Sequence, residues 1–469
     1  MTTVVVAGGG IGGLAAALSL RARGHHAVVC ERGDDFVELG AGIQLAPNGM
    51  HALDRLGLAA AVRRIAVPVG ELRFMDGVSG EHVISMPLGE RYRARFQNPY
   101  VVVHRGELYR LLLRACQDSD GIELRSSSQV TGYEHTDRGV RVRLTDGRTL
   151  AADALVGADG LHSAVRAQLV KDGPPRNAGI TVYRSIVPME RVPEDLRHRS
   201  VTWWTGPGRH FVHYPIAGGR FLNLAPSVEN RPAETFAGVA VPAAEVREQF
   251  AVLCGTAQRL LELGTEWKAW VLVDREPVDV WADGRVVLLG DAAHPMLHYA
   301  AQGACMALED AVVLGDLLNC PAEHFGAALR RFTAARRTRT ARVHGLARDS
   351  IGLWHARGET ATARNKVLSA MSETGLHDYV AWLHGTRNFA APDAPSPSAA
   401  PDPDSPSTEP GAGAQPAAAP APPPADEGTY TLAGPLAPVD VHPADRVTQT
   451  PSAHVGTHTL GGYLDPMDP

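Results

Sequence analysis

The amino-acid sequence predicts an α/β fold: a Rossmann-like domain interleaved with an antiparallel β-sheet domain, then C-terminal helices and a disordered tail. Three observations lead to this prediction. A β-branched run at 3–7 precedes a glycine-rich turn, short strands separated by Pro/Gly turns fill 180–228, and proline is concentrated in 391–469. We therefore expect the first domain at 1–175 and 276–390, the mainly β domain at 176–275, and the tail at 391–469.

The first domain is predicted from alternating strands and helices. The buried strand at 3–7 leads into the glycine-rich turn, a helix at 14–23 that ends at Gly24, and a second strand at 27–30. Later elements of this domain are expected to be helices at 48–56 and 105–115, a β-meander at 139–144 and 149–150, buried strands at 154–157 and 286–289, and helices at 303–318 and 325–355.

The second domain is predicted from short strands bounded by turn residues, at 181–187, 201–205, 210–214 and 220–225. Such a series is typical of an antiparallel sheet. Because it lies between the strands at 154–157 and 286–289, the two domains are expected to interleave along the chain.

Proline and charge separate the tail from the rest of the chain. Residues 391–469 hold 18 of the 34 prolines and carry ten acidic residues against the single basic residue Arg446. Such a segment cannot bury enough apolar surface to become ordered. Residues 1–390 carry 44 basic and 41 acidic residues, a net charge of +3. A nearly neutral body without a basic stripe argues against nucleic acid and favours a small-molecule partner.

Other features of composition bear on the cellular compartment. The chain has no uninterrupted apolar run of about 18 residues, and its first strand begins at Thr3, so neither a membrane span nor a cleavable signal peptide is expected. The five cysteines include no C-x-x-C pair, which favours neither a disulfide framework nor a metal site. We expect a cytoplasmic protein without a bound metal.

A dinucleotide fingerprint opens the chain. Gly8, Gly10 and Gly13 form G-x-G-x-x-G between the first strand and helix, and Glu31 ends the second strand eighteen residues later. The glycines allow a tight turn and close approach of a pyrophosphate, and a carboxylate at Glu31 accepts hydrogen bonds from a ribose diol. A glycine-rich turn without a ligand is the alternative. The fingerprint alone does not distinguish NAD from FAD.

A second strand end distinguishes the two cofactors. The strand at 286–289 ends in Gly290-Asp291, far along the chain from the fingerprint. The ribityl chain and flavin of FAD extend beyond the pyrophosphate and need a polar acceptor such as Asp291, whereas a simple dehydrogenase does not. The helix that begins at Gly303 then directs its positive end at the flavin. The alternative is that Asp291 only caps a turn.

Together with Asp153–Arg166 (DALVGADGLHSAVR), these motifs resemble, in order and spacing, the single-component flavoprotein aromatic hydroxylases with the para-hydroxybenzoate hydroxylase fold. The resemblance covers about residues 3–388. It implies a Rossmann-like FAD-binding domain, a β-sheet substrate domain and a homodimer. It also implies a monooxygenase that uses NADH or NADPH and dioxygen through a flavin C4a-hydroperoxide. The FAD contacts that it implies, beyond those above, are Arg32, Gly42, Arg105, Val130, Asp159, Gly303 and Ala304.

Two segments narrow the subgroup. Leu39–Asn48 (LGAGIQLAPN) and Gly290–Asp310 are similar to the branch that holds salicylate hydroxylases and 3-hydroxybenzoate 6-hydroxylases, and Phe211–Pro215 is similar to the latter. The resemblance therefore implies that a small aromatic acid, 3-hydroxybenzoate, is hydroxylated to gentisate. Decarboxylating hydroxylation of salicylate to catechol and 3-hydroxylation of 6-hydroxynicotinate stay open within this class. A nicotinamide-only dehydrogenase is the alternative from another class.

The expected chemistry needs a base, because a substrate phenol is more nucleophilic as the phenolate. The resemblance implies that His213 is this base. The alternative is a structural histidine of the sheet whose ring nitrogens already have hydrogen-bond partners. Gln302, next to Gly303, is expected to hydrogen-bond the substrate hydroxyl or the hydroperoxide, with helix capping as the alternative. His298 and Tyr299 are weaker candidates, His294 is expected to shape its loop, and Tyr183 or Arg184 could meet a carboxylate.

The sequence also contains a cluster of arginines between 330 and 342, within the long helix predicted at 325–355. We interpret this cluster as the solvated face of that helix, with a contribution to nicotinamide docking left open.

Overall fold

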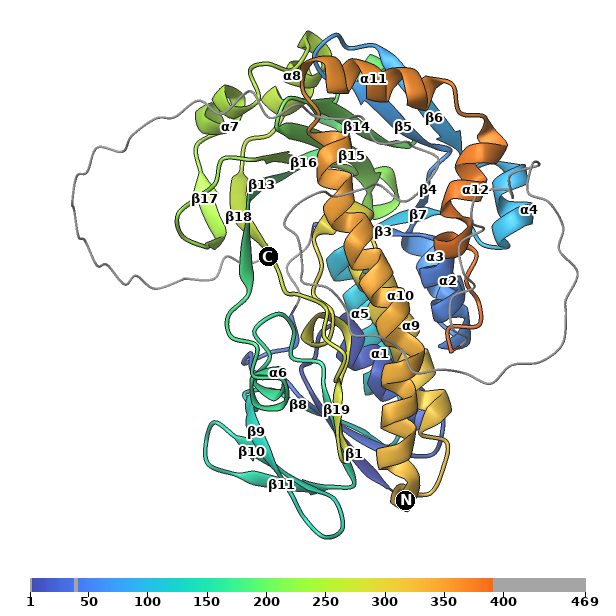
Figure 1. Cartoon of the computed structure of the whole chain (residues 1–469), viewed down its shortest axis with the longest axis vertical. Helices are drawn as coiled ribbons and strands as arrows, with labels where there is room; N and C mark the ends of the chain where they lie inside the picture. The colour runs from blue at the N-terminus through green and yellow to red at the C-terminus, as the bar shows by residue number, and fades with distance from the viewer. Residues whose placement is uncertain (1, 38–40, 391–469) are drawn as a thin grey trace, which may run out of the picture. The chain divides into compact units, whose positions relative to one another are not determined.

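The computed structural model describes residues 2–37 and 41–390 and contains two large sheets (Figure 1). The six-stranded sheet has the order β19-β20-β12-β1-β2-β8, and every pair is parallel except β19–β20. Its strands are β1 (Thr3–Ala7), β2 (His26–Cys30), β8 (Ile122–Arg125), β12 (Ala154–Gly157), β19 (Ala282–Asp283) and β20 (Val286–Leu288). The predicted strands of the first domain are confirmed to within one residue at each end where they join this sheet.

The strand order reverses at β1, which lies between β2 and β12. In open parallel sheets, ligands bind beyond the carboxyl ends of the strands at such a reversal. The glycine-rich turn follows β1 directly, and Gly157 and Leu288 end the two strands on its other side. The sheet topology therefore brings the three predicted motifs to one edge.

The eight-stranded sheet has the order β17-β18-β13-β16-β15-β14-β5-β6, antiparallel except for β14–β5. Its strands are β5 (Glu71–Asp76), β6 (His82–Pro87), β13 (Arg176–Pro188), β14 (Ser200–Gly206), β15 (Arg209–Ile216), β16 (Phe221–Val228), β17 (Ala237–Val241) and β18 (Trp267–Asp274). The antiparallel sheet is confirmed. The sheet extends beyond the predicted domain at 176–275, because β5 from the first segment pairs with β14 and β6 pairs with β5.

The two faces of this sheet pack into different cores. On one face Phe211 and Leu224 join a cluster that also holds Trp204 and Phe250. On the other face Val212 and Tyr214 belong to a separate cluster. Because side chains alternate along a strand, adjacent residues of β15 enter different environments.

Two small sheets and most of the helices surround these large sheets. The first small sheet pairs β3 (Gly42–Leu45), β7 (Val101–His104) and β4 (Val67–Pro68), and the second is the predicted meander of β9 (Val130–His135), β10 (Val140–Leu144) and β11 (Thr149–Ala152). The α-helices are α1 (Ile11–Arg21), α2 (Pro47–Arg55), α3 (Ala59–Ile65), α4 (Glu90–Phe96), α5 (Arg105–Gln117), α6 (Ala164–Leu169), α7 (Ala243–Gln249), α8 (Gly255–Glu262), α9 (Gly303–Leu317), α10 (Phe325–Trp354), α11 (Gly358–Ser369) and α12 (Glu373–His384).

The long helix α10 runs beside α9, which in turn packs against α1 and α2 (Figure 1). The last two helices lie elsewhere, since α11 packs against β6 and α12 packs against β6, α2 and α4. The tail at 391–469 and part of the expected loop at 39–48 lie outside the described residues.

Candidate active site

A cavity of about 390 Å³ lies where the motif-bearing edge of the parallel sheet meets one face of the eight-stranded sheet. Its volume falls in the range of small-molecule sites. The first domain contributes lining residues from the turn after β1, from β3, from the start of α5 and from the segment before α9. The eight-stranded sheet contributes Val182, Arg184, Val212, Tyr214, Asn223 and Ala225.

The three fingerprint glycines differ in what surrounds them. Gly8 has a φ of +99°, and a Cβ there would come within 2.4 Å of the Ala158 carbonyl oxygen. At Gly13 a Cβ would lie 2.0 Å from the Gly8 carbonyl oxygen. Both glycines therefore allow close packing. Gly10, in contrast, lines the cavity and has no atom within 4 Å of its Cβ position, which leaves the N-terminus of α1 open to a phosphate.

Glu31 lies beside this turn, as predicted. Its carboxylate accepts hydrogen bonds from the Gly9 N–H at 2.8 Å and from the Gly33 N–H at 3.0 Å. Carboxylate oxygens can accept further bonds, so the capacity to meet a ribose diol remains. Arg32 follows at the surface, and Val130 is buried in β9. Neither of these two lines the cavity.

The Asp-Gly motif is joined to the Gly-Asp motif through Arg166. Asp159 accepts bonds from the Ser163 hydroxyl at 2.5 Å and the Ala164 N–H at 2.8 Å, which orders the start of α6. Arg166, fully buried in α6, donates to the carbonyls of Ala292 at 3.0 Å and Ala293 at 2.7 Å. Asp159, predicted to contact FAD, does not line the cavity in this structure.

The remaining predicted cofactor residues line the cavity. Arg105, Asp291, Gly303 and Ala304 all do so, and α9 begins at Gly303 as expected. Gly42 also lines it, but its Cβ position lies 2.4 Å from the Tyr214 ring, so packing alone requires a glycine there. A cavity lined by Gly10, Gly303 and the carboxylate-bearing Asp291 fits FAD.

His213 is not where the motif suggested. It pairs with Leu224 in β16, and paired residues share a face, so its side chain lies opposite to Val212 and Tyr214. The ring stacks near Trp204 and also contacts Phe211. Burial, followed by the charges of His198 and Arg73, lowers the pKa of His213 to about 3. Contrary to expectation, strand alternation keeps His213 away from the cavity.

His210 lies on the cavity side of the same strand, two residues before Val212. Its Nδ1 lies 2.8 Å from Nε2 of His355, whose Nδ1 lies 2.5 Å from Oε1 of Glu229. Within the described part of the chain, His210 Nε2 is buried and has no hydrogen-bond partner. The ring centroid is 6.1 Å from that of His298, which lines the cavity.

The hydrogen-bond partners indicate which ring nitrogens carry hydrogens in the series Glu229, His355, His210. The hydrogen bond from His355 lowers the pKa of the Glu229 carboxyl against the opposing effect of burial, so Glu229 is ionised and accepts. His355 donates from Nδ1 to this carboxylate, and its Nε2 lies 2.8 Å from His210 Nδ1 and 3.2 Å from the Tyr299 hydroxyl. When His210 donates from Nδ1, its Nε2 keeps the lone pair.

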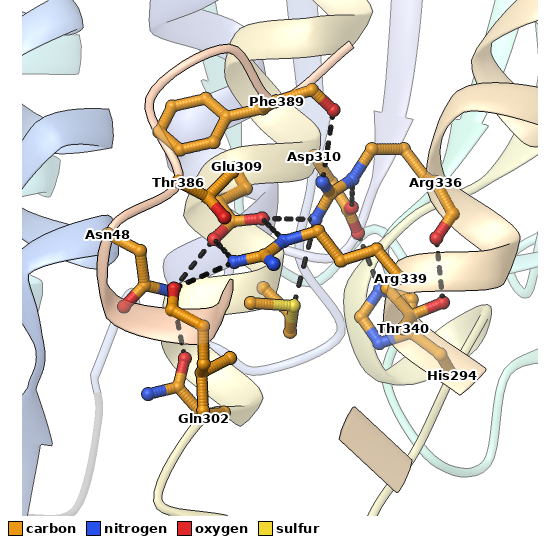
Figure 2. Close-up of polar contacts among 12 residues, drawn as sticks. Asn48, His294, Gln302, Glu309, Asp310, Arg336, Arg339, Thr340, Thr386 and Phe389 are labelled. Atoms are coloured by element: carbon orange, nitrogen blue, oxygen red, sulfur yellow. Dashed lines mark hydrogen bonds and ion pairs between the residues drawn. The ribbon is translucent and has the colours of Figure 1, made fainter. Parts of the chain in front are cut away.

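Gln302 lies in the cavity wall, where the sequence placed it (Figure 2). It holds the N-cap position of α9, but its side chain makes no capping bond. Instead its Oε1 accepts a 2.8 Å hydrogen bond from Nδ2 of Asn48 in α2. The capping alternative is therefore excluded by the geometry.

Behind Gln302 lies a buried ion cluster that corrects the interpretation of the arginine-rich helix at two positions, whereas Arg330, Arg331 and Arg337 are exposed as expected. Arg336 and Arg339 of α10 are buried and pair with Glu309 and Asp310 of α9 at 2.7–2.8 Å (Figure 2). Asp310 also accepts hydrogen bonds from the Gly290 N–H at 3.1 Å and from His294 at 2.6 Å, which ties His294 to α9. The two arginines can be buried because α9 supplies the carboxylates that pair with their charges.

Arg184 and Tyr183 separate in the same way as His210 and His213. Tyr183 donates to Glu245 at 3.1 Å on the far face, whereas Arg184 lines the cavity beside Val182. Arg184 is half-buried against Trp270 and forms no ion pair within the described residues. A half-buried guanidinium without a carboxylate is suited to binding an anionic ligand.

Several of these residues escaped prediction from sequence. His210, His355, Glu229, Asn48, Glu309, Arg336 and Arg339 were not singled out for the site. Because side chains alternate along a strand, the sequence alone indicates that His210 and Val212 share one face of the strand and that Phe211 and His213 share the other. Nothing local indicates that arginines of α10 would meet Glu309 and Asp310, about 30 residues earlier.

Fold and cavity define a flavoprotein whose FAD site adjoins a substrate-sized space. A family model described as FAD binding domain matches residues 1–350, and the chain belongs to this family. The nicotinamide-only dehydrogenase is thereby set aside. No helix within the described ranges is long and apolar enough to cross a membrane.

Known proteins similar to this chain refine the class. The 3-hydroxybenzoate 6-hydroxylase 1 of Aquipseudomonas alcaligenes is 44% identical over 81% of this chain and 97% of its own length. The 3-hydroxybenzoate 6-hydroxylase of Polaromonas naphthalenivorans is 40% identical over 81% of this chain and 95% of its own. The structure of Klebsiella pneumoniae HpxO complexed with FAD and uric acid matches with a TM-score of 0.72 and 29% identity over 80% of this chain and 94% of that chain. The protein is an FAD-dependent aromatic monooxygenase.

Proposed function

We propose that the protein hydroxylates 3-hydroxybenzoate at carbon 6 to give 2,5-dihydroxybenzoate, with FAD, NADH or NADPH, and dioxygen. The observation that carries this proposal is the name shared by relatives 44% and 40% identical over 81% of the chain. When bound and reduced, FAD supplies the activation of dioxygen. The protein's own residues hold the cofactor, bind the acid and ionise its phenol.

The cofactor would be held at both ends of the groove. Gly10 and the start of α1 would meet the pyrophosphate, and Glu31 the ribose. Arg105 and Asp291 line the part of the cavity next to the eight-stranded sheet. The positive end of α9, fifteen residues long, would stabilise negative charge on the flavin.

Arg184 would bind the substrate carboxylate. It is the guanidinium that the eight-stranded sheet presents to the cavity. Burial lowers the pKa of Arg184, but an arginine stays protonated at any physiological pH. A carboxylate in the cavity would therefore supply the partner that the described residues do not.

His210 would accept the phenol proton in place of His213. Burial, then the charges of His355 and His298, lowers the pKa of His210, so its imidazole is neutral and Nε2 is free to take a proton. The Glu229–His355 chain would hold the ring and stabilise the positive charge that forms. Gln302 would donate a hydrogen bond to the substrate oxygen.

The test measures NADH and NADPH oxidation by the FAD-loaded enzyme with 3-hydroxybenzoate, salicylate and 6-hydroxynicotinate, with every product identified. We expect 3-hydroxybenzoate to stimulate oxidation and to yield 2,5-dihydroxybenzoate. Catechol and carbon dioxide from salicylate, without 2,5-dihydroxybenzoate from 3-hydroxybenzoate, would overturn the substrate. Stimulated oxidation without a hydroxylated product would identify 3-hydroxybenzoate as an effector and not a substrate.

A further inference from the structure

We propose that Asn48 is a positioning residue that sets the polarity of the Gln302 amide, so that Gln302 can only donate a hydrogen bond into the cavity. This inference rests on the proposed function, because it assigns Gln302 the stabilisation of a phenolate. The polarity follows from a chain of groups that begins at the buried arginines of α10 and ends at the cavity wall (Figure 2).

The first step is the charge of Glu309. Arg339 donates to both of its oxygens, at 2.8 and 2.9 Å, and Arg336 pairs with it at 2.8 Å. Burial alone would raise the pKa of this carboxyl, but the charges of Arg339 and Arg336 outweigh burial and lower the pKa. Glu309 is therefore a carboxylate, which can only accept hydrogen bonds.

The second step is the orientation of Asn48. One atom of its amide lies 2.7 Å from Oε1 of Glu309, and only the NH₂ group can occupy that place beside a carboxylate. The same Nδ2 has a second hydrogen, which it donates to Gln302 at 2.8 Å. Asn48 Oδ1 is buried without a partner in the described part of the chain, so nothing there favours the reversed amide.

The third step is Gln302 itself. Since Asn48 donates, the Gln302 atom that faces it must be the carbonyl oxygen. The Gln302 nitrogen points away from Asn48 in Figure 2, and the residue lines the cavity. The cavity wall therefore presents an N–H donor. A donor favours the ionised form of a bound phenol, because a phenolate oxygen accepts more strongly than a neutral hydroxyl.

The central experiment compares the FAD-loaded wild type with Asn48→Leu, which keeps the volume and removes the amide. The probe is 3-hydroxybenzoate labelled with ¹³C at the hydroxyl-bearing carbon, whose chemical shift during a pH titration reports phenol ionisation. We expect the pKa of the bound phenol to rise by about one unit in Asn48→Leu, a tenfold change in the ionisation equilibrium. Equal values in the two proteins would overturn the proposal.

Two further variants separate polarity from general damage. Gln302→Glu keeps the shape and turns an acceptor toward the cavity, so it should raise the phenol pKa by at least as much as Asn48→Leu. In a Gln302→Leu background, Asn48→Leu should cause no further shift, because Asn48 acts through Gln302. A further shift in that background would mean that Asn48 acts by another route and would overturn its assignment.

Asn98→Leu is the matched control. Asn98 is also buried and donates to the carboxylate of Asp54, which Arg63 pairs, but it does not line the cavity. The control should lose stability as Asn48→Leu does and leave the phenol pKa unchanged. If the phenol pKa shifted equally in Asn98→Leu and Asn48→Leu, the shift would be explained by loss of packing, and the proposal would be rejected.

One measurement needs no substrate. In crystal structures of the two FAD-loaded proteins, the Gln302 side chain should leave its wild-type position in Asn48→Leu, and an unchanged position would overturn the proposal. If 3-hydroxybenzoate fails to bind the wild type, the proposed substrate is wrong, while this comparison still decides the role of Asn48. If Asn48→Leu does not fold, the Gln302→Glu titration decides instead, and an unchanged phenol pKa would reject the proposal.

Discussion

The guanidinium of Arg166 lies 2.7 Å from the carbonyl oxygen of Ala293, 127 residues later in the chain. This hydrogen bond joins the Asp-Gly segment after β12 to the Gly-Asp segment after β20. Asp172 pairs with the same guanidinium at 2.7 Å and with Arg275 at 3.1 Å. The two motifs that face the cavity are therefore held by one buried cation.

Replacing that cation should weaken the cofactor site. In Arg166→Met, the carbonyls of Ala292 and Ala293 lose their donor and Asp172 keeps only Arg275. We expect a loss of about 3 kcal/mol in the free energy of unfolding and at least tenfold weaker FAD binding, measured by urea denaturation and flavin fluorescence. Arg148→Met, which removes an exposed pair with Asp146, should leave both unchanged. Unaltered FAD affinity in Arg166→Met would contradict the coupling.

Adjacent arginines on α10 should differ sharply. Arg336→Met would leave Asp310 and Glu309 short of a buried partner, at a cost of about 3–5 kcal/mol in the free energy of unfolding. Arg337→Met would remove only the exposed pair with Asp279, at a cost of about 0–1 kcal/mol. Chemical denaturation of both variants makes the comparison. Similar losses in the free energy of unfolding for the two variants would contradict the buried position of Arg336.

The opposite faces of β15 should separate the two histidines in catalysis. His210→Phe removes the proposed proton acceptor and should lower kcat by about 10²-fold or more with 3-hydroxybenzoate. His213→Phe replaces a ring in an apolar core and should keep kcat within about threefold of wild type. Steady-state kinetics at matched FAD content provide the measurement. The reverse order of effects would restore His213 as the base.

His213 should contribute to acid sensitivity, together with the other buried histidines whose pKa is lowered, among them His298 and His384. Its folded-state pKa of about 3 lies below the value of about 6.5 expected when unfolded, so between these values the unfolded chain binds more protons. The free energy of unfolding therefore falls as the pH drops from about 6.5 toward 3, by about 1.4 kcal/mol per pH unit from this residue. His213→Phe should reduce that slope by the same amount in denaturation series. An undiminished slope would argue against a buried neutral His213.

Arg184 should contribute to affinity for the acid. Arg184→Met removes the cation that the eight-stranded sheet presents to the cavity, so KM for 3-hydroxybenzoate should rise about 10- to 100-fold. The neutral amide of the same acid serves as the matched ligand, and its affinity should change little. Equal losses for the acid and the amide would indicate disturbed packing against Trp270 in place of a lost ion pair.

The cofactor class and the order of the elements follow from local patterns in the sequence. The fingerprint, Glu31 and Gly290-Asp291 are local patterns in which strand, turn and helix follow one another, so their physical meaning is contained in the residues present. Gln302 could be placed for the same reason, because it directly precedes the helix that begins at Gly303.

Which side chains enter the site depends on contacts that exist only in the folded chain. In β15 a change of one residue moves a side chain to the other face, so the choice of His210 over His213 depended on the register with β16 and on where the cavity lies. Arg336 and Arg339 look like surface residues until α9 supplies Glu309 and Asp310 beside them. A buried charge is stabilised only by its partner, and that partner is known only once the chain has folded.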